Sequence, residues 1–191
     1  MMTSNGATIR HATREGKLPQ MLITMPLTPP PDVPTIFALI KELAVYENAA
    51  DSVHATPELL LKNLAFDDGT STTEPTFTPG HARTLLIVAP DGEICGMGMY
   101  FFNFSTWTGT PGIYLEDLYI KAIYRGRGYG KALIKRLAQE VVKVGGHRLC
   151  WVCLNWNKPS LEFYATLGAT RMNDWVGLRL EDDALLRVAE N

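Results

Sequence analysis

The sequence predicts one α/β domain with a mixed sheet and helices on both of its faces, and three observations lead to this prediction. Four short apolar segments have the alternation or density typical of strands: 84–89, 93–102, 113–120 and 147–154. Three segments carry apolar residues at helical spacing: 33–46, 130–144 and 157–167. The chain has 191 residues, of which 46% are hydrophobic, so it is long enough for one well-packed core and short for two.

The domain is expected to span residues 21–191. Residues 1–20 are expected to form a disordered extension, because they are mostly polar and show no amphipathic face. A first short strand is predicted at Met21 to Met25, before three consecutive prolines interrupt the chain. Asp32 is expected to cap the helix at 33–46, and Pro57 lies near the first turn of a second, short helix that ends at Leu64.

Turn residues separate the remaining elements. Pro90-Asp91-Gly92 is a good hairpin turn between the strands at 84–89 and 93–102. Two solvent loops are expected, at 66–81 and at 103–112, and Trp107 is expected to pack inside the second. Glycines end the helices at 130–144 and 157–167. A last strand at 176–181 and a short helix from Asp182 complete the chain.

Charge and cysteine content exclude several classes of protein. The net charge is −2 and the pI about 6.1, so neither nucleic acid nor an anionic membrane is expected as a partner. No apolar stretch approaches the roughly 20 residues that a membrane span needs. Cys150 and Cys153 have C-x-x-C spacing, but on a strand their thiols point to opposite faces, which does not suit a metal or redox pair. Reduced cysteines fit a cytoplasmic protein.

The loop Arg125-Gly126-Arg127-Gly128-Tyr129-Gly130 lies between an expected strand and an expected helix, where backbone N–H groups and the helix dipole can hold an anion. It is not a P-loop, because only three residues separate Gly126 from Gly130 and Ala132 replaces the hydroxyl that would hold magnesium. The dinucleotide pattern G-x-G-x-x-G does not match either, because the third glycine comes one residue early. A glycine-rich turn without a ligand remains the alternative to a different anion loop.

Arg125, Gly128 and Gly130 fit a third pattern, R-x-x-G-x-G, and with the element order they resemble the GNAT superfamily of N-acetyltransferases. The resemblance extends to four segments in one order: 40–47, 114–120, 124–130 and 156–164. Together these segments resemble the diamine acetyltransferases, the spermidine/spermine and thialysine N-acetyltransferase branch. The resemblance implies the GNAT fold, in which a mixed, largely antiparallel central sheet is flanked by helices on both faces.

The resemblance further implies acetyl-CoA as the cosubstrate and assigns its contacts. The pantetheine arm would lie along the strand edge, as an added strand does, against the main chain of Leu118, Tyr119 and Ile120. The pyrophosphate would be held by the glycine loop and the start of the helix: Arg125, Gly126, Arg127, Gly128, Tyr129, Gly130 and Lys131. Three residues lie where the family contacts the cofactor again: Asn157, Pro159 and Ser160.

The amine substrate would lie against six residues: Tyr46, Glu47, Glu116, Cys150, Trp151 and Val152. An alkyl ammonium group has a pKa of about 10.4 and must lose a proton before it can attack a thioester. Glu116 would attract the cation and accept that proton, directly or through a water. Tyr164 matches the family's tyrosine beside the thioester sulfur and would protonate the departing thiolate. No metal is expected to take part.

Several alternatives stay open. The positions that correspond to acidic residues of the polyamine enzymes are less acidic here, at Leu154-Asn155 and after Glu47. Thialysine or another lysine-like amino acid therefore competes with a polyamine such as spermidine. A protein lysine acetyltransferase and a catalytically silent CoA-binding regulator are the other candidates. The resemblance also implies a homodimer whose pockets use both chains.

Overall fold

The computed structural model describes residues 2–14, 32–71 and 73–190. It divides into two compact units, Met1–Val152 and Cys153–Asn191, which are described separately below. The strand expected at Met21 to Met25 lies outside the described residues. The expectation of one domain over 21–191 stays a prediction.

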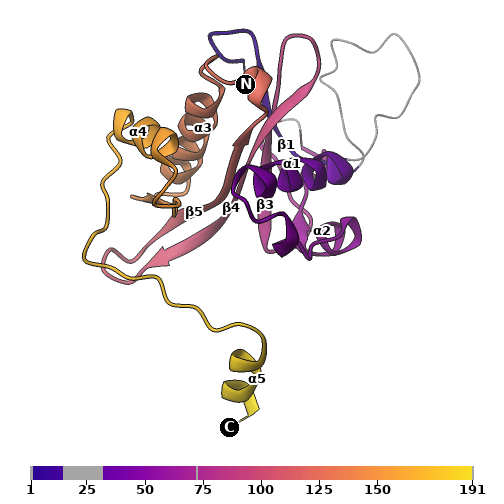
Figure 1. Ribbon diagram of the computed structural model, residues 1–191. Coiled ribbons are helices and arrows are strands. Elements are labelled where there is room, and N and C mark those ends of the chain that lie inside the picture. The colour runs from indigo at the N-terminus through magenta and orange to yellow at the C-terminus, as the bar shows by residue number, and fades with distance from the viewer. Residues whose placement is uncertain (1, 15–31, 72, 191) are drawn as a thin grey trace. The chain divides into compact units, whose positions relative to one another are not determined.

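The first unit is built on a six-stranded sheet (Figure 1). Its strands are β1 Thr8–His11, β2 Leu64–Ala65, β3 Ala82–Val88, β4 Ile94–Ser105, β5 Thr110–Ile120 and β6 Leu149–Cys150. The order is β1-β3-β4-β5-β6, with β2 beside β3. The pairs β2–β3 and β5–β6 are parallel and the others antiparallel. The predicted mixed, largely antiparallel sheet is therefore confirmed.

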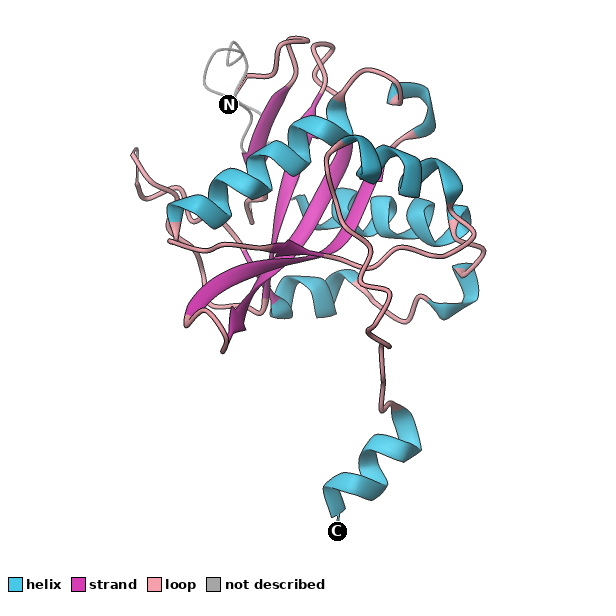
Figure 2. Cartoon of the chain, turned by 90° about the vertical axis from the view of Figure 1, so that its left-hand side faces the viewer, coloured by secondary structure: helices cyan, strands magenta, loops and turns pink. Residues whose placement is uncertain are grey.

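Helices cover both faces of this sheet, as Figures 1 and 2 show. Helix α1 (Asp32–Tyr46) and the short α2 (Pro57–Asn63) lie on one face, and α3 (Tyr129–Lys143) lies on the other. The α1 face is closed by an apolar cluster that includes Ile36, Leu39, Leu86 and Met97. On the α3 face, Leu133 and Leu137 are fully buried. A Cβ added at Gly98 of β4 would lie 3.7 Å from a Leu137 methyl carbon, an ordinary packing distance, so α3 packs on this face at normal van der Waals separation.

The sheet begins in a stretch that was expected to be disordered. Residues Thr8–His11 form β1 and pair with β3, so the expectation for residues 1–20 is wrong there. The physical reason is a long-range ion pair. The Arg10 guanidinium donates two hydrogen bonds, of 2.7 and 2.8 Å, to the buried carboxylate of Asp32, which also accepts one from the Thr13 amide. Polar residues that satisfy one another in this way can be buried.

Both expected loops are more ordered than predicted. In the segment 66–81, Phe66 is buried and Asp67 forms β-bridges to Thr13 and Phe77. In the segment 103–112, β4 and β5 continue to a short turn, so most of these residues belong to a hairpin. Trp107 lies in that turn with 88% of its surface exposed and does not pack into the core.

The second unit contains α4 (Lys158–Thr166) and α5 (Asp182–Glu190), close to the bounds predicted for both helices. The strand expected at 176–181 is absent, since none of these residues is assigned to a strand. The strand expected at 147–154 is also shorter than predicted and comprises Leu149–Cys150 alone. In the described part of the chain, no helix is both long and apolar enough to cross a membrane.

Candidate active site

A β-bulge interrupts the pairing of β4 and β5 in the middle of the sheet. Tyr100 pairs with Leu115, whereas the adjacent Met99 pairs with Asp117. Glu116 is therefore the extra residue, with no partner on β4. A bulge bends its strand and re-aims the neighbouring side chains, and such irregularities are common beside active sites. Here the bulge presents two carboxylates, Glu116 and Asp117, in succession.

The other edge of β5 loses its strand partner close to the bulge. The described pairing with β6 is restricted to Ile113 with Leu149 and Tyr114 with Cys150. From Leu115 onward no strand of the described sheet pairs with this edge, so its main-chain groups can accept an extended ligand in the manner of an added strand. The predicted pantetheine contacts Leu118, Tyr119 and Ile120 all lie on this part of β5.

Two acidic side chains, Glu116 and Glu47, act electrostatically on a third, Asp117, at the bulge. The pKa of Asp117 is raised to about 6 by burial and by the negative charges of Glu116 and Glu47. Burial also raises the pKa of Glu47, which follows the last residue of α1. Because Met99 and its partner Asp117 share a face of the sheet and Met99 packs in the α1 cluster, Asp117 lies on the α1 face. We call Glu47, Glu116 and Asp117 the acidic triplet.

The glycine loop lies directly after β5 and a short 3₁₀ turn, Ala122–Tyr124. Gly126 and Gly128 adopt φ values of 75° and 77°, in the left-handed region that glycine enters without steric cost. Gly128 is the N-cap of α3, and the Ala132 amide donates a hydrogen bond to the Gly128 carbonyl. The N–H groups of the three residues before Ala132, which include Gly130 and Lys131, precede this first helical bond and can therefore receive an anion.

Arg125 connects the start of the loop to the end of α1. Its Nε donates to the Ile120 carbonyl at 2.9 Å. Its guanidinium carbon lies 4.8 Å from the Tyr46 ring centroid and 5.6 Å from that of Tyr119. The predicted cofactor residue Arg125 and the predicted amine-side residue Tyr46 are thus in contact, through a cation–π interaction. The structure therefore brings Tyr46, Glu47, Glu116 and the glycine loop into one region of the first unit.

The remaining amine-side residues lie at and beyond β6. Cys150 pairs with Tyr114 on the strand, and Trp151 and Val152 follow after the strand has ended. Trp151 is half-buried, whereas 77% of the Val152 surface is exposed.

The second unit holds the other predicted residues. The Asn157 side chain caps α4 by accepting a hydrogen bond from the Ser160 amide at 3.3 Å, and Pro159 lies in the first turn. Tyr164 is half-buried on α4, with its ring centroid 5.2 Å from that of Phe163. Asn157 therefore has a structural task in addition to the cofactor contact predicted for it.

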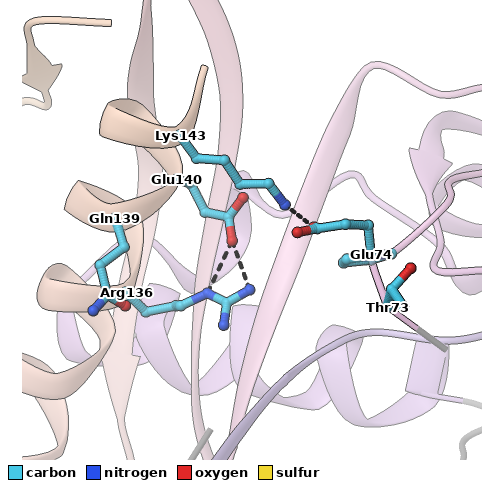
Figure 3. Close-up of a pocket in the computed structure, with 7 residues that line it drawn as sticks. Thr73, Glu74, Arg136, Gln139, Glu140 and Lys143 are labelled. Carbon is cyan, nitrogen blue, oxygen red and sulfur yellow. Dashed lines mark hydrogen bonds and ion pairs between the residues drawn. The ribbon is translucent and has the colours of Figure 1, made fainter. Parts of the chain in front are cut away.

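A pocket of about 300 Å³ lies elsewhere, beside the C-terminal half of α3 (Figure 3). None of the predicted site residues lines it. Its charged side chains are already paired, because Lys143 bonds to Glu74 and Arg136 bonds to Glu140 (Figure 3). These pairs leave little net charge to attract a charged ligand, so we do not place the active site there.

The fold and this site define the class of the protein. The model of the acetyltransferase (GNAT) family matches residues 53–169, and the chain belongs to this family. The match runs across both structural units. The protein is accordingly an N-acetyltransferase of a family that uses acetyl-CoA, and the predicted resemblance is confirmed.

Relatives refine this assignment. Thialysine N-epsilon-acetyltransferase of Bos taurus is 36% identical over 166 residues, which cover 83% of this chain and 92% of that protein. L-ornithine N5-acetyltransferase NATA1 of Arabidopsis thaliana is 29% identical over 199 residues and covers 87% of each chain. Among solved structures, an integron cassette protein from V. cholerae has a TM-score of 0.68 at 19% identity and covers 97% of this chain and 98% of its own. That last likeness concerns the fold alone.

Asp117 is a titratable member of the site that the sequence prediction does not include. The signal for it in the sequence is the pair Glu116-Asp117, of which the prediction names Glu116 alone. Strict strand alternation would place these neighbouring side chains on opposite faces of the sheet. The bulge, which no pattern in the sequence indicates, removes that restriction.

Proposed function

We propose that this chain transfers the acetyl group of acetyl-CoA to the terminal primary amine of a small lysine-like amino acid or polyamine. The observation that carries the proposal is the acidic triplet, which lies at a bulge beside an unpaired strand edge. A cationic amine is attracted to such a group of carboxylates, and an acyl-pantetheine arm fits the strand edge. The two substrates would then meet beside Glu116 in a ternary complex.

The first unit supplies most of the acetyl-CoA contacts in this proposal. The β5 main chain from Leu118 to Ile120 binds the pantetheine arm, and the loop from Arg125 to Lys131 binds the pyrophosphate. Asn157, Pro159 and Ser160 at the start of α4 add the remaining contacts. Two features support pyrophosphate binding by this loop: the left-handed conformation of its glycines and the main-chain N–H groups at the start of α3. Both suit a bound anion.

The acidic triplet provides the base. Glu116 accepts the ammonium proton, directly or through a water, and the adjacent Asp117 shares the task because it belongs to the same acidic triplet. The pKa of Asp117, about 6, supports this role, since an effective base has a pKa near the working pH. The free amine attacks the thioester carbonyl, and a main-chain N–H of the β5 edge stabilises the oxyanion. Tyr164 donates its proton to the thiolate as the carbon–sulfur bond breaks.

Two observations support the substrate class: the acidic side chains lie in one compact region, and the names of two relatives contain amino acids with a side-chain amine. Thialysine and ornithine, in the names of the two relatives above, are amino acids that carry a terminal amine on their side chain. Tyr46 and the acidic triplet form one compact acidic region, which suits a single ammonium group. A polyamine offers further ammonium groups that need carboxylates farther away, and Leu154-Asn155 does not provide them.

Steady-state kinetics on an amine panel tests the function. Purified protein and acetyl-CoA are combined with thialysine, lysine, ornithine, spermidine and a lysine-containing peptide, and release of free CoA is followed. We expect the highest kcat/KM with one of the three amino acids. Highest activity on the peptide would instead identify a protein lysine acetyltransferase. Binding of acetyl-CoA without turnover of any amine would identify a silent CoA-binding protein and reject the proposal.

We also propose that the protein is a cytoplasmic homodimer. Apolar side chains with more than half of their surface exposed follow one another along residues 175–188: Trp175, Val176, Leu178, Leu180, Leu185, Leu186 and Val188. Val176, Leu178 and Leu180 alternate as the residues on one face of a strand do, although no strand forms there. In a symmetric dimer, a second copy of the chain would cover these exposed apolar side chains. Light scattering at micromolar concentration tests this, and a monomeric mass would reject it.

A further inference from the structure

Residues 3–7 form a closed turn before β1. The Thr3 carbonyl accepts a hydrogen bond from the Gly6 amide at 3.1 Å, and the Thr3 amide donates one to the Ala7 carbonyl at 2.7 Å. The Thr3 hydroxyl oxygen accepts a further bond from the Ala7 amide at 3.1 Å. Gly6 closes the turn with a φ of 75°. The turn is thus held by its own hydrogen bonds and presents the side chain of Asn5 at its tip.

Asn5 lies directly against the glycine loop, 122 residues further along the chain. Its side-chain Nδ2 donates a hydrogen bond of 2.5 Å to the main-chain carbonyl of Arg127. The same nitrogen lies 3.5 Å from the position that a Cβ on Gly128 would occupy. The contact therefore involves the peptide group that joins Arg127 to Gly128, in the middle of the loop.

The orientation of this peptide group matters for an anion. In a trans peptide the C=O and the N–H point in opposite directions. A donor that holds the Arg127 carbonyl on one side therefore directs the Gly128 N–H to the other. Arg127 lies between two left-handed glycines, which can change their dihedral angles at little steric cost. Without an outside contact this peptide group can rotate, and the Gly128 N–H then loses its direction.

Other contacts hold the base of the loop but reach different groups. The Tyr124 hydroxyl donates to Asp91 at 2.8 Å, and Lys121 pairs with Glu93 at 2.6 Å, both on the β3–β4 hairpin. The Arg127 side chain turns back and donates to the Ile123 carbonyl at 3.1 Å. These bonds fix residues 121–125 and the Arg127 side chain. The hydrogen bond from Asn5 acts on the main chain of the loop itself.

We propose that Asn5 is a positioning residue for the pyrophosphate loop, which aims the Gly128 N–H at the phosphates of acetyl-CoA by holding the Arg127 carbonyl. This inference rests on the proposed function and adds to it a part of the chain that none of the family contacts includes. Asn5 does not touch the acetyl group or the amine. Its effect should therefore appear in cofactor affinity and not in the chemical step.

Two acetyl donors separate this role from a general structural one. Acetyl-CoA carries the pyrophosphate, and S-acetyl-pantetheine has the same thioester and pantetheine arm without it. We expect Asn5→Ala to raise the Kd and KM for acetyl-CoA about fivefold, as the loss of one hydrogen bond does, with little change in kcat. The kcat/KM for S-acetyl-pantetheine should remain at the wild-type value. Equal losses with both donors, or no loss with acetyl-CoA, would overturn the proposal.

Two further variants complete the experiment. Asn5→Asp keeps the shape of the side chain, but an ionised carboxylate has no proton to donate and repels phosphate. It should raise the KM for acetyl-CoA more than Asn5→Ala does, and a wild-type KM would count against the proposal. Asn63→Ala is the matched control, because its amide also donates to a main-chain carbonyl, that of Leu59, at the opposite end of β3. Failure of the wild-type protein to bind acetyl-CoA would reject the proposed function instead.

Discussion

The α3 face of the sheet buries the carboxylate of Glu140, the α1 face half-buries that of Asp117, and the pKa values of the two groups shift in opposite directions. On the α3 face, the pKa of Glu140 is lowered to about 2 by His11, whose Nε2 lies 3.8 Å from its Oε1, and by Arg136, whose Nη2 lies 2.6 Å away. On the α1 face, the pKa of Asp117 is raised to about 6 by burial and by two further negative charges. One carboxylate is compensated by the guanidinium of Arg136, and the other is placed among carboxylates.

The difference separates a stabilising charge from a functional one. A buried carboxylate with a lowered pKa adds to the free energy of unfolding at neutral pH, whereas one with a raised pKa subtracts from it. A shift of one pKa unit corresponds to about 1.4 kcal/mol. Glu140 is therefore expected to stabilise the folded protein. Asp117 is expected to destabilise it as long as no cationic amine is bound. Such opposed shifts are typical of active sites, where a substrate supplies the missing charge.

The largest expected effect is that of Asp117→Asn on catalysis. Removal of this carboxylate should lower kcat/KM for the preferred amine about 100- to 1,000-fold, the usual contribution of a positioned base. The same substitution should raise the free energy of unfolding at pH 7.5 by about 2 kcal/mol, because it removes a disfavoured charge. Amine kinetics and urea denaturation measure the two quantities. Asp51→Asn, on the exposed turn after α1, is the control and should change neither.

Glu140→Gln should show the reverse behaviour. We expect the free energy of unfolding at pH 7.5 to fall by about 3 kcal/mol, because Arg136 and His11 lose their anionic partner. The kcat/KM should remain within twofold of the wild type. Glu74→Gln serves as the control, since it breaks an exposed ion pair beside the same pocket and should cost less than about 1 kcal/mol. A large loss of activity in folded Glu140→Gln protein would end the separation of roles between the two faces.

Tyr164→Phe tests the protonation of the departing CoA thiolate, a step in which neither Asp117 nor Glu140 takes part. We expect kcat to fall about 30-fold and the Kd for acetyl-CoA to stay unchanged, because the hydroxyl acts only as the carbon–sulfur bond breaks. Single-turnover kinetics and calorimetric titration with acetyl-CoA provide the two numbers. An unchanged kcat would remove Tyr164 from the mechanism.

The smallest effect is the pH dependence of stability, where the two carboxylates have opposite signs. The folded pKa of Asp117 lies above its ordinary value of 3.8, so the advantage of Asp117→Asn should be complete above pH 6 and decrease to zero near pH 4. The folded pKa of Glu140 lies below its ordinary value of 4.5, so the deficit of Glu140→Gln should persist to pH 4.5 and decrease only below it. Each change amounts to about 1.4 kcal/mol per pH unit. Parallel pH profiles for the two variants would contradict the assignment.

The part of the fold that the sequence predicted well is the part that local patterns determine. The apolar stripe of α3 and the turn Pro90-Asp91-Gly92 each depend on residues a few positions apart, and both were placed within a few residues. The glycine loop was also located correctly between β5 and α3, because its spacing is itself a local signal. The class of enzyme was predicted from the resemblance of this loop, the element order and three further segments to the GNAT superfamily.

The features that were missed depend on distant residues. β1 could not be predicted because Arg10 becomes acceptable in the interior only through its ion pair with Asp32, 22 positions away. Val176 to Glu181 has the alternation of a strand and forms none, since alternation provides no hydrogen-bonding partner. The contribution of Asp117 to the site depends on a bulge, and that of Asn5 depends on contact with a loop 122 residues further along the chain.

The bulge at Glu116 also bears on how this enzyme could gain or lose its activity in evolution. The pairs Tyr100–Leu115 and Met99–Asp117 adjoin each other on β4, so a chain that lacked Glu116 would join them in an uninterrupted ladder. Deletion of this one codon should yield a protein that folds and accumulates normally but has lost a carboxylate and the local bend. Conversely, insertion of one glutamate codon into a regular hairpin would create both the extra carboxylate and the bend in the strand. Screens that score abundance would overlook such changes, and only an assay of acetyl transfer would detect them.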